Sequence, residues 1–594
     1  MVINMQVFER IEALRNHMCS EGMDFYIIPS QDAHQSEYVA GYWRARAWFS
    51  GFIGSAGTLI VTADGAYLWV DGRYHIQAEQ EVAGSGITLY KMGLPGVPKM
   101  DDWMKENIKP GHVVGCDGRM IGMQTGKSWE ELLPEAKFVY QKDLAAKVWT
   151  DRPVLPVAPL FELAADVAGE SRADKLARVR KHLNEKKAQY LMLASLDDVA
   201  WLTNLRGNDI SHTPVFYSYM LVGLEKAWLF ADEAKFSEEI KANLVNDGVE
   251  LVSYDGLPNM LQKVEAGKVL LNDKRINMLL GASIPEDWKV EVELDITTKF
   301  KACKNETERK NIREAHVKDG AAIVKFLKWI EEAVQDADHP IDECDAADYL
   351  DARRKEMPGC FDLSFGTIAG YNANGASAHY SAKRGSCAVL KPEGMMVVDS
   401  GGQYYEGTTD ITRTVVLGPV TEKMKKAYTL VLKGHLALGH AKFMEKTPGY
   451  YLDVLARGPL WQAGMDFRHG TGHGVGYVLS VHEGPQNIGR GNIAVDLEPG
   501  MLISNEPGYY AEGEFGVRIE NLIMVKESEK TVDGQFLEFE TMTMCPYDWK
   551  AIDETLLNEQ EKIWIAEYHQ QVFETLKPYL NTEEVAWLAK ATRQ

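Results

Sequence analysis

The stretch that decides the fold of the carboxyl-terminal half is MMVVDSGGQYYEGTTDITRTVVLG, residues 395–418. Apolar residues open and close it and threonines precede the second run, so it predicts the two strands of a β-hairpin. Asp399 follows the apolar run 395–398, and Asp410 stands among threonines. An aspartate beside a turn is usually a cap, but carboxylates at the ends of two strands are costly to bury unless they face a cation. The hairpin therefore predicts a cation site.

Three segments downstream add side chains of the same chemistry. HGTGHGVGYVLSVHEGP (469–485), ISNEPGYY (503–510) and GVRIENLIMV (516–525) contribute His469, His473, His482, Glu506, Arg518 and Glu520. The spacing of His469 and His473 falls on a glycine-rich segment and so differs from the helical H-E-x-x-H zinc motif. Glu520 lies in an apolar strand with Arg518 two residues before it on the same face, which also fits a purely structural ion pair.

Taken together, these positions form an oxygen-rich set of possible ligands. The set is four carboxylates and one imidazole: Asp399, Asp410, Glu506, Glu520 and His473. Such ligands suit hard or borderline divalent ions such as Mn²⁺ rather than thiolate-seeking metals. Two divalent ions balance four negative charges, whereas one ion leaves a buried pocket strongly negative. The sequence therefore predicts a dinuclear centre.

Upstream of this region, one pattern occurs twice. The strand-like run 23–32 and the hairpin 54–74 around Asp64 are followed by similar segments at 188–198 and 218–232. At an offset of 161, Val61 and Ala66 align with Val222 and Ala227. Any two β-hairpins look alike to some degree, but the matching order of elements favours two copies of one α/β domain.

Two boundaries divide the chain. Residues 151–163 contain three prolines, which suits a linker, and near residue 300 the sequence passes from strand-like to helical, with a capping-box pattern at Asn305 and Glu308. These signals predict domains at 1–157, 158–304 and 305–594, the last with an extension over 537–594. Its end, 553–592, has apolar residues at helical spacing, including Trp564 and Tyr568.

Composition excludes several classes of function. The net charge of −22 disfavours nucleic acid and anionic membrane surfaces as partners. No apolar run approaches the length of a membrane span, and Glu9 and Arg10 stand where a signal peptide has its apolar core. The seven cysteines are scattered without a C-x-x-C, so a disulfide framework is not expected. These features predict a cytoplasmic protein.

The order VVDSGG, TTDITRT, HGTGHGVG, SNEPGYY and VRIEN resembles the pita-bread metallopeptidases, the family of methionine aminopeptidase, prolidase and aminopeptidase P. The segments IIPSQDAHQSEYVA, FSGFIGSAGT, VDGRY and NLRGNDISHTPVFYSYML are similar to the first two domains of the three-domain cytosolic Xaa-Pro aminopeptidases, and LEFETMTMCPYDWKAID to their carboxyl-terminal extension. The resemblance implies an α/β (α+β) fold class: two related α/β domains, then a pita-bread catalytic domain.

The resemblance also implies a role for each site residue. Asp399 binds one metal ion, His473 and Glu506 bind the other, and Asp410 and Glu520 bridge the two ions. A water between the ions loses a proton and attacks the carbonyl, while Glu506 carries the proton to the leaving nitrogen. His379 and His482 are implied to orient the scissile bond, His469 to line the proline pocket, and Arg518 to hold Glu520.

Substrates, assembly and rivals follow from the same resemblance. It implies peptides with proline at the second position, a Mn²⁺ cofactor pair and a homodimer formed through the last domain, with Trp564 and Tyr568 as contacts. Prolidase, which takes dipeptides, and an inactive relative that binds peptides or histones remain alternatives. Methionine aminopeptidase is disfavoured by the two preceding domains, and metal-free creatinase-like hydrolases by the intact ligands. Asp71, Arg73 and Glu37 either reach the site of a neighbouring subunit in an oligomer or hold the first domain together, and they are left out of the catalytic set.

Overall fold

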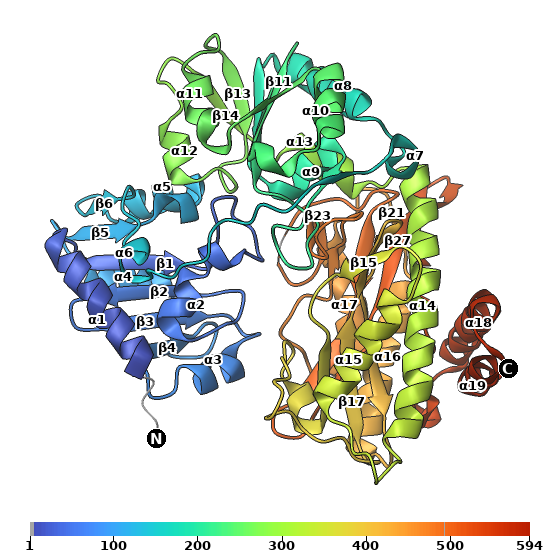
Figure 1. Ribbon diagram of the computed structural model, residues 1–594. Helices are drawn as coiled ribbons and strands as arrows, with labels where there is room; N and C mark the ends of the chain where they lie inside the picture. Colours follow the sequence, from blue (N-terminus) through green and yellow to red (C-terminus); the bar gives the residue numbers. More distant parts are fainter. Residues whose placement is uncertain (1–4, 492) are drawn as a thin grey trace. The chain divides into compact units, whose positions relative to one another are not determined.

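The computed structural model describes residues 5–491 and 493–594, and the chain forms two compact units. One unit comprises residues 1–165 and 170–297, and the other comprises 166–169 and 298–594 (Figure 1). The predicted boundary near 300 lies close to this division, whereas the predicted boundary at 157/158 falls inside the first unit and stays a prediction.

The first unit contains two six-stranded sheets with the same plan. The first sheet has the order β4-β3-β2-β1-β5-β6 and the second the order β12-β11-β10-β8-β13-β14. The strands are β1 (Phe25–Pro29), β2 (Thr58–Thr62), β3 (Ala66–Val70), β4 (Thr88–Lys91), β5 (Val113–Cys116), β6 (Lys137–Val139), β8 (Tyr190–Leu193), β10 (Ser218–Gly223), β11 (Ala227–Ala231), β12 (Val249–Val252), β13 (Lys268–Leu271) and β14 (Lys289–Val292).

The registers confirm the predicted repeat. Val61 pairs with Ala66 in the first hairpin, and Val222 pairs with Ala227 in the second. In the first copy, β1 runs antiparallel to β2 and parallel to β5. In the second copy, β8 likewise runs antiparallel to β10 and parallel to β13. The two segments that the sequence aligned at an offset of 161 therefore occupy equivalent places in two copies of one fold.

Helices cover both faces of the first sheet, because its strands are apolar at successive positions. Tyr26 and Ile28 of β1 pack into one apolar cluster, and Phe25 and Ile27 pack into another. The first copy contributes α1 (Met5–Ser20), α2 (Ala45–Ser50), α3 (His75–Glu81), α4 (Met100–Asn107), α5 (Met123–Leu132) and α6 (Ala145–Val148); the second contributes α8 (Arg172–Lys186), α9 (Leu196–Thr203), α10 (Glu238–Asn246), α11 (Leu257–Leu261) and α12 (Met278–Ala282).

A buried histidine joins the two copies. His34 follows β1; its Nδ1 lies 2.7 Å from the carbonyl oxygen of Ala194, and its Nε2 lies 2.7 Å from the hydroxyl of Tyr254. The Nδ1–H thus donates to the carbonyl, and Nε2 accepts from the tyrosine. Burial lowers the pKa of His34, which keeps the ring neutral.

The second unit places strands between long helices. Its sheets have the orders β16-β17-β20, β15-β18-β19, β21-β28-β27-β24-β22-β23 and β25-β26. The strands are β15 (Cys360–Leu363), β16 (Ile368–Tyr371), β17 (Met395–Ser400), β18 (Gly402–Tyr404), β19 (Gly407–Thr408), β20 (Ile411–Val416), β21 (Lys442–Met444), β22 (Gly472–Gly474), β23 (Glu483–Ile488), β24 (Leu502–Asn505), β25 (Gly508–Ala511), β26 (Phe515–Arg518), β27 (Asn521–Thr531) and β28 (Gly534–Thr541).

Helices of this unit seen beside the strands in Figure 1 are α14 (Glu306–Ala333), α15 (Glu343–Lys355), α16 (Glu422–Gly439) and α17 (Asp453–Gln462). The first three begin at side-chain caps, whereas α17 is preceded by Leu452, which cannot cap it. The predicted capping box is confirmed: Asn305 and Glu308 each accept a backbone hydrogen bond from the other residue. β17 is buried on both sides, because Met396 packs in the cluster that includes α14 and α15, and Met395 packs in the cluster that includes α16.

The hairpin predicted over 395–418 is formed by β17 and β20, which pair antiparallel with Asp399 opposite Thr412. The residues between them do not make a simple turn. They form β18 and β19, which join β15 in a separate three-stranded sheet.

The predicted helical tail is two helices, α18 (Glu559–Leu576) and α19 (Thr582–Thr592). Tyr568 of α18 is buried within its own chain, where its hydroxyl donates to the carbonyl of Thr543 over 2.9 Å. The prediction that Tyr568 contacts a second subunit is therefore wrong, because this chain's own core covers it. Trp564 stacks on His440 at 4.3 Å between ring centroids. Among the described residues, no helix combines the length and apolar character that crossing a bilayer requires.

Candidate metal centre

Two pairs of strands bring the predicted ligands together. Asp399 lies in β17 and Asp410 directly precedes β20, so the pairing of these strands sets both carboxylates at one end of the sheet. Glu520 joins them because its backbone N–H donates to the carbonyl of Thr412 over 3.0 Å, and its Oε2 accepts from the Thr412 hydroxyl over 2.8 Å.

His473 and Glu506 come from neighbouring strands of the six-stranded sheet. The backbone of His473 in β22 donates to Ser504 Oγ over 3.0 Å, and the backbone of Glu506 donates to the carbonyl of Thr471 over 2.8 Å. Gly472 permits this approach: a Cβ there would lie 2.0 Å from the carbonyl oxygen of Ser504. The glycines of the segment 469–485 thus serve close strand packing beside the site.

The ligand atoms converge around the imidazole of His473. Single atoms of Asp410, His473 and Glu520 all lie within 4.8 Å of one another. Nε2 of His473 lies 3.5 Å from Asp410 Oδ2 and 3.5 Å from Glu506 Oε1. Its Nδ1 lies 3.0 Å from the carbonyl of Gly474, so Nδ1 carries the proton and the Nε2 lone pair faces the carboxylates.

The carboxylates repel one another strongly. Burial, together with the charge of Glu520, raises the pKa of Asp410 well above its usual range, and burial with the charge of Glu506 does the same for Glu520. Burial raises the pKa of Glu506 to about 7, with Arg518 opposing and Asp399 adding to the rise. Oδ1 of Asp399 is buried and has no hydrogen-bond partner among the described residues. These four carboxylates fit divalent cations, which favour their ionised forms and satisfy the unpaired oxygen.

The ion pair expected between Arg518 and Glu520 is wrong. Arg518 Nη2 lies 2.6 Å from Asp399 Oδ2, while Glu520 accepts from Thr412. Side chains two residues apart share a face only within one continuous strand. Here β26 ends at Arg518 and β27 begins at Asn521, so the two side chains diverge.

A chain of hydrogen bonds connects Arg518 to His469. Arg518 Nη1 donates to the hydroxyl of Tyr510 over 2.6 Å, and that hydroxyl lies 2.8 Å from Nε2 of His469. Nδ1 of His469 lies 2.7 Å from the carbonyl of Gly470, so Nε2 accepts from Tyr510. Burial, with Arg518 nearby, lowers the pKa of His469 to about 3, and the ring is neutral. Tyr510 is a site residue that the sequence reasoning missed, although it stands four residues after Glu506 in the segment 503–510.

The other two predicted histidines also lie in this region. The ring of His482 meets the ring of His473 edge-on at 4.4 Å between centroids. His379 is close enough to His469 for its charge to lower the pKa of that ring further. The carbonyl of the preceding residue, Ala378, accepts from Arg518 Nη2 over 3.3 Å. The structure thus brings all nine predicted site residues into one region.

A second missed residue organises the segment that carries His379. The carboxylate of Glu343, at the start of α15, is fully buried. It accepts from the backbone of Tyr371 at 2.7 Å and of Ala388 at 2.8 Å, and from the side chains of Asn374 at 3.0 Å and Tyr380 at 2.7 Å. A glutamate in the first turn of a helix usually contributes only a favourable charge there, so this role could not be predicted from the sequence.

The three residues left out of the catalytic set lie in the first unit and contact one another. Arg73 Nη2 lies 2.9 Å from Asp71 Oδ2, and Nη1 lies 3.4 Å from Glu37 Oε1.

Four family models match the chain in order. They are the creatinase/prolidase N-terminal domain at residues 10–148, a second form of it at 151–308, metallopeptidase family M24 at 310–527 and the C-terminal region of peptidase M24 at 535–594.

Full-length relatives agree with these matches. A probable Xaa-Pro aminopeptidase P from Laccaria bicolor is 40% identical over 98% of this chain and 92% of its own length, and aminopeptidase P2 from Arabidopsis thaliana is 38% identical over 99% and 88%. The crystal structure of an X-prolyl aminopeptidase from Caenorhabditis elegans, a cytosolic enzyme with a di-nuclear active site, is 33% identical with a TM-score of 0.95, over 99% of this chain and 100% of that chain. The chain therefore belongs to metallopeptidase family M24 and, within it, to the Xaa-Pro aminopeptidases.

Proposed function

We propose that this enzyme removes the first residue from peptides whose second residue is proline, using two divalent metal ions. The observation that supports this most directly is the convergence of Asp410, His473 and Glu520, whose ligand atoms lie within 4.8 Å of one another. The unpaired buried oxygen of Asp399 adds a fourth position that faces no protein donor. The di-nuclear site of the Caenorhabditis elegans relative supports two ions rather than one.

In this proposal Asp399 would hold one ion, His473 and Glu506 would hold the other, and Asp410 and Glu520 would be shared by both. When bound, the two ions would supply a hydroxide nucleophile at neutral pH and polarise the scissile carbonyl. We propose Mn²⁺ because oxygen ligands outnumber the single imidazole.

Glu506 is the proposed proton carrier. A carboxylate beside the attacking water can accept its proton and return it to the leaving group. Glu506 takes the proton from the attacking water and gives it to the proline nitrogen as that group leaves. The position of its Oε1, 3.5 Å from Nε2 of His473 and so within the cluster of ligand atoms, supports the assignment.

The three histidines are proposed to handle the substrate. His379 and His482 orient the scissile bond and stabilise the tetrahedral intermediate, and His469 lines the pocket for the proline ring. Arg518 is a positioning residue in this scheme. Its Nη2 holds Asp399, and its Nη1 holds Tyr510, whose hydroxyl in turn holds His469.

Substrate length and the proline ring test this function together. The experiment is metal analysis of the purified enzyme followed by kcat/KM for Xaa-Pro-Xaa, Xaa-Ala-Xaa and Xaa-Pro substrates. We expect tripeptides to be cleaved at least as well as dipeptides, and alanine in place of proline to cost about 1–3 kcal/mol of transition-state binding. Cleavage of dipeptides alone would assign the enzyme as a prolidase. A metal-loaded protein without turnover would be the inactive binding relative.

We also propose that the protein is a cytoplasmic homodimer that associates through its last domain. The cytosolic relative and the seven free cysteines support the compartment. With Tyr568 buried, the apolar candidates for a contact surface are Ile563, 49% exposed, and Tyr579, 56% exposed. Light scattering at micromolar concentration should give the mass of a dimer, and Ile563→Glu should shift it toward the monomer; a monomeric wild type refutes the dimer.

A further inference from the structure

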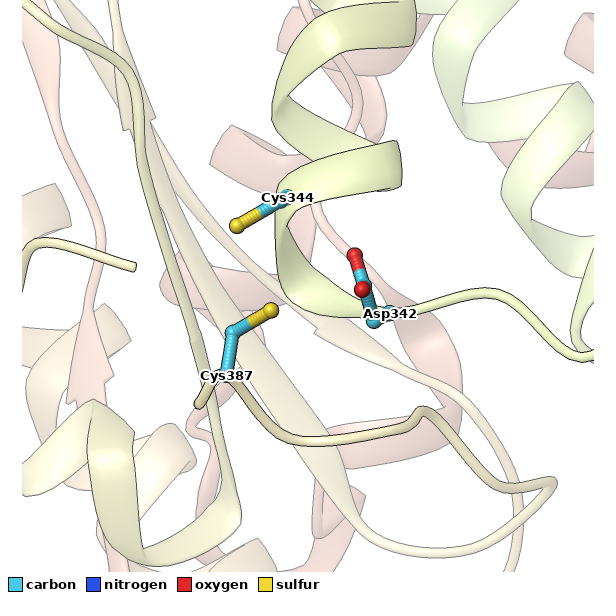
Figure 2. A group of neighbouring side chains, drawn as sticks. All are labelled: Asp342, Cys344 and Cys387. Carbon is cyan, nitrogen blue, oxygen red and sulfur yellow. The ribbon is translucent and has the colours of Figure 1, made fainter. Parts of the chain in front are cut away.

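Two cysteines outside the metal centre face each other where α15 begins. Cys344 is the second residue of α15, and Cys387 lies in the segment that runs beside the start of this helix. Both thiols are free and half-buried. Their sulfur atoms and a carboxylate oxygen of Asp342 all lie within 4.8 Å of one another, and Figure 2 shows the two thiols pointing into the same space.

The backbone holds the two cysteines opposite each other. Asp342 and Val389 form an antiparallel bridge; on one side of it the N–H of Leu390 donates to the carbonyl of Ile341, and on the other the N–H of Glu343 donates to the carbonyl of Ala388. Cys344 and Cys387 stand two positions beyond this bridge, one on each chain, where α15 has already begun. A disulfide would bring their sulfur atoms, which lie within 4.8 Å of each other, to about 2.05 Å.

The surroundings favour a bond between the sulfurs over a metal ion. Oδ1 of Asp342 accepts from the backbone of Asp345 at 2.8 Å as the helix cap, and Arg384 Nη1 lies 3.4 Å from the same oxygen. A cation would have to compete with the helix N–H and with a guanidinium for this carboxylate. The carboxylate of Asp342 is thus already engaged by protein donors, whereas the two thiols lie next to each other.

We propose that Cys344 and Cys387 are a dithiol site that is reversibly oxidised to an intramolecular disulfide by a low-molecular-weight disulfide such as oxidised glutathione. The bond joins the first turn of α15 to the end of the segment that Glu343 holds and that carries His379. Formation requires no change of register, because the backbone bonds at 341–343 and 388–390 already set the two chains side by side.

The exchange is balanced in atoms and electrons. The thiolate of Cys387 attacks one sulfur of oxidised glutathione, and the first glutathione thiolate leaves with a proton from solvent. Cys344 then loses its proton and attacks the Cys387 sulfur, which releases the second glutathione. The protein loses two protons and two electrons, and the two glutathione molecules gain them as thiols. Burial, and to a lesser extent a hydrogen bond to Cys387, raises the pKa of the Cys344 thiol to about 12. Because Cys344 is therefore protonated at neutral pH, we assign the first attack to Cys387.

Mass spectrometry of the full-length enzyme tests the proposal directly. The protein is incubated with oxidised glutathione at neutral pH, free thiols are blocked with iodoacetamide in denaturant, and trypsin is added without reductant. Peptides 329–353 and 385–413 contain Cys344 and Cys387 as their only cysteines. We expect these two peptides joined, with a mass two hydrogens below their sum, and separated again by dithiothreitol.

Matched variants and contrary outcomes make the test decisive. Cys344→Ser and Cys387→Ser should each abolish the joined peptide, whereas Cys360→Ser, at another half-buried cysteine, should keep it. The proposal is wrong if both thiols stay alkylatable while the exposed Cys19 takes up glutathione. A glutathione that persists on Cys387 without cross-linking also contradicts it. So does a Zn²⁺ ion that protects both thiols until a chelator removes it, since the trio would then be a metal site.

Discussion

At the scale of single residues, the centre depends on carboxylates that cannot all be ionised unless a cation lies among them. Asp410 and Glu520 are buried to within a few per cent of exposure, and each carries a strongly raised pKa caused first by burial. A divalent ion reverses this effect, because it favours the ionised form of every oxygen that it contacts. Metal content is therefore the most direct readout of the assigned roles.

Removing one imidazole should remove one ion. We expect His473→Ala to retain about half of the wild-type metal and to lose activity by several orders of magnitude, because Nε2 is the proposed ligand of one ion only. Asp410→Asn and Glu520→Gln should lower the binding of both ions, and exhaustive chelation of the wild type should abolish turnover. Elemental analysis beside kcat/KM measures this. His339→Ala, at an exposed histidine, is the control. Full activity in a metal-free enzyme would disprove the two-metal mechanism.

The hydroxyl of Tyr510 is the residue-scale prediction that the sequence did not make. Tyr510→Phe leaves Arg518 Nη1 and His469 Nε2 without the partner that each has at 2.6 Å and 2.8 Å. An unpaired buried donor or acceptor costs about 1–3 kcal/mol, so we expect kcat/KM to fall roughly 10- to 100-fold while metal content stays unchanged. Steady-state kinetics with metal analysis checks this, and wild-type kinetics in the variant would show that the hydroxyl has no part in positioning His469.

At the scale of elements, α15 determines where the segment 371–388 lies. Its first residue, Glu343, accepts hydrogen bonds from both ends of this segment and from Tyr380, the residue after His379. A single carboxylate with several backbone and side-chain donors is a strong constraint, since each bond to a charged acceptor is worth more than one to a neutral group.

Replacing that carboxylate by an amide should loosen the segment. Glu343→Gln keeps the shape but turns one acceptor into a donor that faces other donors, so we expect a loss of about 1–3 kcal/mol of stability. We also expect a lower kcat/KM with metal content intact, because the change reaches His379 and not the ligands. Glu356→Gln, at the exposed end of the same helix, should alter neither quantity. Equal effects of the two substitutions would contradict the positioning role.

At the scale of the whole molecule, the two copies in the first unit share a buried neutral histidine. Burial lowers the pKa of His34 below its ordinary value of 6.5. Below pH 6.5 the unfolded chain takes up a proton that the folded ring refuses, so stability is complete above this pH and falls as the pH decreases toward the folded pKa. The loss is at most about 1.4 kcal/mol for each pH unit.

The variant His34→Gln isolates this contribution. We expect the wild type to lose more stability than the variant between pH 7 and pH 5, with the two curves parallel above pH 7. Urea unfolding at several pH values measures the free energy of unfolding of both proteins. Subtracting one curve from the other removes the contribution of the histidines that both proteins share. Parallel curves over the whole range would show that His34 is not held neutral.

The sequence alone determined most of the local structure and the set of candidate ligands. The strand pattern of 395–418, the cap at Asn305 and the repeat at an offset of 161 depend on neighbours a few residues apart, so their signals are complete within short windows. The residues of the metal centre were recognisable for a related reason: carboxylates in apolar strands are costly, and few explanations other than a cation account for them together.

The tertiary structure alone decided which side chains meet. Arg518 pairs with Asp399 rather than with Glu520, because β26 ends at Arg518 and the next two residues no longer continue its alternation of faces. Tyr568 is buried because α18 packs this side chain against the apolar core of its own chain. Glu343, Tyr510 and the pair of Cys344 and Cys387 gained their partners from segments tens of residues away. Contacts of that kind depend on how elements pack, and no periodicity or spacing within one segment records them.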